Sequence, residues 1–142
     1  MFTEAMNYFY YRTSINELRW MNIGNEGGGG LTYNSLLYLN VIAYTPECTI
    51  SKLAEIVRIT KPAVTIKVNE LVKRGCVVKE RSAIDKRVYY LHLSPSMEEL
   101  YGMFDRLGAS TEKMLLSCYT VEDLELFSKM LRDIANYEPE EA

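Results

Sequence analysis

The chain has 142 residues, of which 48% are hydrophobic and 25% charged, values typical of one ordinary soluble domain with an apolar core. Its formal net charge of −3 is unlike that of a nucleic-acid-binding protein, unless the charge is distributed unevenly. No run approaches the roughly 18 apolar residues that cross a bilayer, and the chain does not begin with a basic segment followed by an apolar one, so we expect an unprocessed cytoplasmic protein without membrane segments.

The first predicted element is an amphipathic helix over about residues 3–22. Side chains of one face recur three or four positions apart, the spacing of a helix; these are Phe2, Met6, Phe9, Thr13, Ile15 and Leu18. Residues 22–30 then contain Asn22, Gly24 and four consecutive glycines, whose backbone entropy disfavours a helix. We expect a mobile connection here.

A second, largely buried helix is predicted after Thr32, which can cap its N-terminus. It ends before Thr45 and Pro46, because proline disfavours helical backbone in the residue that precedes it. Its apolar residues are Leu36, Leu37, Leu39, Val41, Ile42 and Ala43.

Two shorter helices follow, joined by a tight turn. Thr49 or Ser51 can cap the first, and Thr60 can cap the second, which carries Pro62 in its first turn and ends at Gly75. The residues expected to face inward are Leu53, Ala54 and Val57 in the first helix and Val64, Val68, Leu71 and Val72 in the second.

Residues 76–81 and 88–93 are rich in β-branched and aromatic side chains and predict two short strands, with residues 82–87 as the hairpin tip. Helical spacing returns after Ser94 and Pro95. Its seam comprises Leu100, Phe104, Leu107, Thr111, Met114 and Cys118. A last helix, which Thr120 can cap, carries a further seam of Leu124, Phe127, Leu131 and Ile134.

The charge is concentrated in one part of the chain. Residues 51–93 hold ten basic and four acidic residues, a net charge of +6, whereas the remainder holds six basic and fifteen acidic residues, a net charge of −9. A locally positive surface attracts phosphates, and an acidic remainder limits nonspecific adhesion. This asymmetry favours a nucleic-acid partner for residues 51–93.

Two short helices, a tight turn and a basic hairpin are the parts of a helix-turn-helix with a wing. A helix fits the major groove, its N-terminus presents free N–H groups to phosphate, and the hairpin can reach the minor groove. We expect base contacts from the first two turns of the second short helix, through Lys61, Thr65, Ile66 and Lys67, and phosphate contacts from Lys73, Arg74 and Lys79.

The run TISKLAEIVRITKPAVTIKVNELVKRGCVVKERSAIDKRVYYLHLS resembles the core of the multiple-antibiotic-resistance regulator (MarR) family. The matching features are Leu53 with Ala54, Val64 with Thr65, Leu71 with Gly75, and Asp85 with Arg87. The resemblance covers about residues 32–96 by motif, and the flanking helices agree in order and length. It implies a mainly α fold with a small β-hairpin wing, in which a winged helix-turn-helix core is flanked by dimerisation helices.

By this resemblance, Arg87 enters the minor groove and Asp85 holds it by hydrogen bonds, with Lys86 between them at the wing. The sequence departs from the family pattern at Ile66, where a basic residue is common, and Lys67 lies one position later. This departure leaves the base contacts open. The Gly that commonly follows the second wing strand is also missing at Met97, which affects only the start of the next helix.

We therefore predict a single winged-helix domain over residues 1–142, with a DNA-binding lobe over about 32–96 and dimerisation helices over about 1–22 and 97–138. The dimer interface is expected to use Phe2, Met6, Phe9, Leu124, Phe127, Leu131 and Ile134. The leading hypothesis is a homodimeric, ligand-tunable repressor or activator, with repressor the first choice, that binds a pseudo-palindromic operator in double-stranded DNA. The alternative is a winged-helix module that binds protein, because fold alone does not choose between them.

A small aromatic ligand could bind among aromatic side chains of the first two helices, although core and dimer packing explains them more simply. The candidates are Tyr8, Tyr11, Trp20, Tyr33 and Tyr38. No cofactor is expected. The three cysteines are spaced too widely for a disulfide framework or a zinc knuckle, and the single His92 cannot complete a metal site. With no hydrolase, phosphate-loop or metalloprotease motif, the sequence does not indicate an enzyme.

Overall fold

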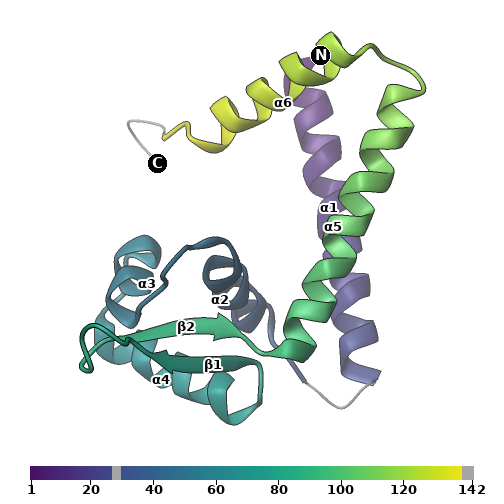
Figure 1. Cartoon of the computed structure of the whole chain (residues 1–142). Coiled ribbons are helices and arrows are strands. Elements are labelled where there is room, and N and C mark those ends of the chain that lie inside the picture. Colours follow the sequence, from purple (N-terminus) through teal and green to yellow (C-terminus); the bar gives the residue numbers. More distant parts are fainter. Residues whose placement is uncertain (27–29, 139–142) are drawn as a thin grey trace. The chain divides into compact units, whose positions relative to one another are not determined.

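A computed structural model describes the backbone of residues 1–26 and 30–138; the side chains of residues 20–26 are outside the description. The chain divides into two compact units, residues 1–98 and 99–142. In chain order the elements are α1 (Phe2–Glu26), α2 (Tyr33–Tyr44), α3 (Ile50–Val57), α4 (Lys61–Lys73), β1 (Val77–Arg81), β2 (Tyr89–Leu93), α5 (Pro95–Leu116) and α6 (Val121–Ala135) (Figure 1). The predicted mainly α fold with a β-hairpin wing is confirmed.

Helix α1 is longer than predicted, since it continues through residues 22–26, which were expected to form a loop. Asn and a single Gly each cost about 1 kcal/mol or less relative to Ala inside a helix, which a long helix tolerates. Residues 27–29 lie outside the described part of the chain, so the mobile glycine connection stays a prediction. Within the described residues, none of the helices is both long and apolar enough to cross a bilayer.

Threonine side chains cap three helices as expected. The Oγ1 atoms of Thr32, Thr49 and Thr120 accept hydrogen bonds from backbone N–H groups three residues on, and Thr120 forms a full capping box with Asp123. Thr60 occupies the N-cap position of α4, but its side chain makes no capping hydrogen bond. The predicted position of the cap is therefore right, but the predicted capping hydrogen bond from the Thr60 side chain is absent. Pro62, which has no N–H to satisfy, assists the helix start.

The end of α4 is fixed by a glycine. Gly75 has φ +71°, a left-handed conformation that side chains rarely adopt. Its N–H donates to the carbonyl of Val72 at 2.9 Å, and the N–H of Cys76 donates to the carbonyl of Leu71 at 2.9 Å. This is the Schellman arrangement, which satisfies carbonyls at the helix end and turns the chain into β1.

The core of the winged lobe lies between α2, α3, α4 and the hairpin (Figure 1). Leu39, Leu53, Leu71 and Leu91 are among its fully buried side chains, and each contributes about 1.5–3 kcal/mol to folding. Strands β1 and β2 are antiparallel, with Val77 opposite Leu93 and Arg81 opposite Tyr89. These contacts hold α4 and the hairpin in one unit.

Helices α5 and α6 supply most of the second unit. The turn between them ends at the Thr120 capping box, which defines where α6 begins. None of the residues of α6 is buried, although the helix is strongly amphipathic. Within the α5–α6 unit its apolar face is therefore only partly covered.

Candidate nucleic-acid interface

The first two turns of α4 present a mixed polar and apolar surface. Val64 and Val68 are fully buried, Ile66 between them is directed away from the core, and Thr65 and Lys67 are half-buried. Lys61 is exposed, and Ile66 is 73% exposed. Thr65 is half-buried, and its hydroxyl donates to the carbonyl of Lys61 at 2.7 Å, which is the usual bond of a threonine inside a helix.

Glu70 lies between two of the predicted DNA contacts. Its Oε2 atom is 3.2 Å from the Nζ atom of Lys67, and its Oε1 atom is 3.2 Å from the Nε atom of Arg74. Lys67 is also largely covered, with a side chain 17% exposed. A terminal N–H of Arg74 further donates to the carbonyl of Gly30 at 2.9 Å. Both cations thus form ion pairs with the same carboxylate.

The remaining predicted phosphate contacts lie on either side of Gly75. Lys73, in the last turn of α4, is exposed. Lys79 on β1 is also exposed, and its Nζ atom donates to Oδ1 of Asn69 at 2.7 Å. This bond ties the wing to the outer face of α4, so Lys79 is directed along the helix.

At the wing tip, Asp85 and Arg87 form the predicted hydrogen bonds. Oδ1 of Asp85 accepts from the backbone N–H of Arg87 at 3.0 Å and from Nε of Arg87 at 3.2 Å. Oδ2 of Asp85 accepts from Nη2 of Arg87 at 3.3 Å. The side-chain bonds, and then the backbone bond, lower the pKa of the Asp85 carboxyl below its ordinary value. The side chain of Arg87 nevertheless remains 91% exposed. It is oriented but accessible.

Two residues that were not predicted as functional shape this tip. Arg81 donates from Nε to the carbonyl of Lys86 at 2.6 Å, and its guanidinium lies 5.9 Å from the centre of the Tyr89 ring. The hydroxyl oxygen of Ser82 accepts from the N–H groups of Ile84 and Asp85, both at 3.3 Å. A serine three residues before an aspartate in a turn is the sequence signal that could have indicated this arrangement.

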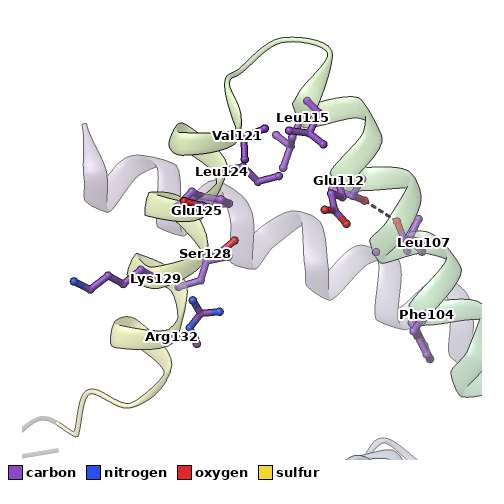
Figure 2. Close-up of a pocket in the computed structure, with 15 residues that line it drawn as sticks. Phe104, Leu107, Glu112, Leu115, Val121, Leu124, Glu125, Ser128, Lys129 and Arg132 are labelled. Carbon is purple, nitrogen blue, oxygen red and sulfur yellow. Dashed lines mark hydrogen bonds between the residues drawn. The ribbon is translucent and has the colours of Figure 1, made fainter.

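Three of the four predicted dimerisation residues of α6, Leu124, Phe127 and Leu131, line an apolar groove of about 1040 Å³ between α5 and α6. Figure 2 shows the place of Leu124 in this groove. Leu124 is half-buried in it, whereas Phe127 is 48% and Leu131 is 43% exposed. Ile134 is 36% exposed and lies further along the same helix. On α1, Phe2 and Phe9 are exposed and Met6 is half-buried.

The candidate aromatic-ligand residues are only partly together. Tyr8 and Tyr11 are exposed on α1 with ring centres 6.4 Å apart. The hydroxyl of Tyr33 donates to Glu17 on α1 at 3.5 Å, a long bond. Tyr38 is buried in the core of the winged lobe, and the side chain of Trp20 lies outside the described residues. For Tyr38, packing is sufficient explanation.

The cysteines and the histidine have ordinary surroundings. Cys48 and Cys76 are buried and Cys118 is exposed. Burial raises the pKa of the Cys48 thiol, an effect that nearby Lys52 only partly offsets, so Cys48 lacks the thiolate character of a reactive cysteine. His92 pairs with Glu80 across the hairpin, at 3.1 Å between Nε2 and Oε2. Among the described residues, no three metal-ligating side chains gather at one place.

A tight helix-turn-helix followed by a basic hairpin that projects an oriented arginine defines a winged helix-turn-helix protein. Residues 29–88 match the model of the MarR family, a range that holds α2, α3, α4, β1 and the wing tip but ends before β2. Over these residues the chain is similar to the MarR family. No curated protein is similar enough in sequence to count as a relative.

Several solved structures share the fold. FabT of Streptococcus pneumoniae in complex with DNA is 22% identical over 88% of this chain and 90% of its own, with a TM-score of 0.55. A MarR-like transcriptional regulator from Thermotoga maritima is 24% identical over 89% and 95%, with a TM-score of 0.61. A MepR mutant from a multidrug-resistant S. aureus clinical isolate is 19% identical over 89% and 93%, with a TM-score of 0.63. At these identities the likeness establishes the fold.

Proposed function

We propose that the chain acts as a homodimeric repressor that binds a pseudo-palindromic operator, with α4 of each protomer in successive major grooves and the wing in the adjoining minor groove. The observation that carries this proposal is the pair of Asp85 and Arg87. An arginine side chain that is 91% exposed yet fixed by a carboxylate loses little conformational freedom when it enters a narrow, negatively charged groove.

The surface of α4 supplies the complementary contacts. Lys61 lies at the helix N-terminus, where free N–H groups also favour phosphate. Ile66 is 73% exposed, and an apolar side chain at this place suits the methyl group of thymine. Lys73 at the end of α4 and Lys86 at the wing tip are exposed and suit backbone phosphates. The base-contacting set is therefore short and partly apolar.

The dimer follows from the second unit and from α1. A second copy would cover Phe127 and Leu131 in the α5–α6 groove and the exposed Phe2 and Phe9 of α1. Each such side chain, once fully buried, contributes about 1.5–3 kcal/mol to dimer stability.

A small aromatic effector that contacts Tyr8, Tyr11 and Tyr33 would tune DNA binding by this dimer. FabT in complex with DNA offers a parallel for the DNA-bound form.

In the recognition surface of α4, the exposed Ile66 suits a protein-binding module instead. The net charge of +6 over residues 51–93 outweighs it, because a single exposed apolar side chain is common on protein surfaces. The proposal also includes a cytoplasmic location and the lack of an enzymatic role. A gel-shift assay on DNA from the chain's own upstream intergenic region tests the DNA-binding proposal directly. Failure to shift this DNA at low salt would contradict it.

The dependence of binding on salt concentration and on flanking DNA sequence distinguishes phosphate contacts from the minor-groove contact. Lys73→Ala should weaken binding to all sequences alike and make the salt dependence shallower by about one unit per protomer, because one cation fewer neutralises a phosphate.

Arg87→Ala should instead lose affinity chiefly on operators with A·T-rich flanks, by about 1–3 kcal/mol per site. Arg87→Lys should recover part of the loss, since an ammonium is more strongly hydrated than a guanidinium, and Asp85→Ala should produce a milder defect. Titrations on flanks that differ only in A·T content provide the measurement. Equal losses on both flanks would make Arg87 an ordinary phosphate contact.

A further inference from the structure

Glu70 is the only acidic residue of α4, and it contacts two of the basic residues assigned to DNA binding. Its two oxygens are divided between them, with Oε2 at 3.2 Å from Nζ of Lys67 and Oε1 at 3.2 Å from Nε of Arg74. The spacings are i to i+3 and i to i+4, so the three side chains lie on one helix face. One carboxylate therefore partly neutralises two cations.

The arrangement is more restrained than a surface ion pair on an exposed helix. The side chain of Lys67 is 17% exposed and that of Arg74 is 38% exposed, and Arg74 also donates to the carbonyl of Gly30 at 2.9 Å. To reach a phosphate, either side chain must first leave Glu70. The attraction of the cation to DNA is then offset by the ion pair with Glu70 that has to break.

We propose that Glu70 is a specificity-determining residue that restrains Lys67 and Arg74 and so lowers the sequence-independent affinity for DNA. This inference rests on the proposed DNA-binding function. Nonspecific binding comes almost entirely from cations that release counterions from phosphates. A helix with two restrained cations binds noncognate DNA weakly, and discrimination then depends on Lys61, Ile66 and the Arg87 wing.

The test compares Glu70→Gln with wild-type protein on a noncognate duplex of random sequence, titrated at several salt concentrations. Glutamine keeps the shape of the side chain and removes its charge. We expect about tenfold tighter noncognate binding at low salt and a salt dependence steeper by about one to two units per protomer, because each freed cation adds about 0.9. Circular dichroism and denaturant unfolding verify that the variant is folded.

Glu55→Gln is the matched control, since Glu55 is an exposed carboxylate on α3 of the same unit and its loss changes the net charge equally. It should alter the salt dependence much less than Glu70→Gln. The double variant Lys67→Gln with Glu70→Gln should have a salt dependence about one unit shallower than that of Glu70→Gln alone. This difference would assign that part of the added salt dependence to Lys67.

The outcomes for the two proposals are distinct. Equal slopes for Glu70→Gln and Glu55→Gln would overturn the role of Glu70, while wild-type binding to the upstream DNA would still support the repressor function. If wild-type protein prefers its upstream DNA no more than the random duplex, the repressor function fails, whereas a steeper slope for Glu70→Gln still supports the restraint of the two cations.

Discussion

The winged lobe and the α5–α6 unit are built from similar amphipathic helices but differ in what covers their apolar faces. In the lobe, Leu53 of α3 and Leu71 of α4 are 0% exposed. In α6, Phe127 is 48% and Leu131 is 43% exposed, and the helix has no buried residue. A helix pattern thus defines an apolar face without specifying whether the same chain or another one covers it.

The difference also separates two kinds of stability. The lobe closes its core with residues from three helices and a hairpin, so its folding is a property of one chain. In the α5–α6 unit Phe127 and Leu131 remain exposed, and if a second copy covers them, as proposed, the order of this unit should depend on protein concentration. Substitutions in the two regions should therefore differ in whether their effect depends on protein concentration.

The largest effect is expected in the core of the lobe. Leu53→Ala removes a side chain that is 0% exposed, and the cavity should cost about 2–5 kcal/mol of the free energy of unfolding. Denaturant unfolding at fixed protein concentration measures it. The loss should be the same at every protein concentration if the lobe folds by itself, and a concentration-dependent loss would contradict the separation of the two regions.

A smaller effect with a different signature is expected in α6. Leu131→Ala should leave the lobe folded and weaken the dimer about tenfold, or about 1.4 kcal/mol, because the interface then buries less apolar surface. Sedimentation at several concentrations measures the change. Leu37→Ala in α2 is the control, since Leu37 is 46% exposed but lies in the lobe. A monomeric wild type at micromolar concentration would refute the proposed dimer.

The smallest perturbation uses the cysteines as reporters. Burial raises the pKa of the thiols of Cys48 and Cys76, with Lys52 and Arg74 offsetting part of the rise, so little thiolate forms near pH 8. Both should react with an alkylating reagent only when the lobe opens. Cys118, which is exposed in the α5–α6 unit, should react first. Mass spectrometry of peptides identifies the labelled site, and rapid labelling of Cys48 would show that the lobe core is open.

Local signals in the sequence predicted most of the fold. Thr49 and Thr120 cap their helices, and Gly75 ends α4, because these features depend on neighbours within a few residues. The exceptions also have physical reasons. α1 passes through Gly24 because one glycine is a small cost in a long helix, and Thr60 holds the cap position without the cap bond.

The candidate interface was predictable in composition but not in its internal contacts. The hydrogen bonds between Asp85 and Arg87 were expected from the family resemblance and are present. The spacing of Glu70 from its two cations was visible in the sequence as ordinary helix pairing. The bond between Asn69 and Lys79 was not, because it depends on how the hairpin packs against α4.

The glycine that ends α4 also limits how this protein can change its target during evolution. With Pro62 in the first turn and Gly75 at φ +71°, both ends of the helix are fixed. One inserted residue would rotate all later side chains by about 100° and turn Val68 and Leu71 away from the core. Insertions should therefore be selected against in α4 and tolerated near residue 84, so new operator preferences should arise by substitution at outward positions of α4.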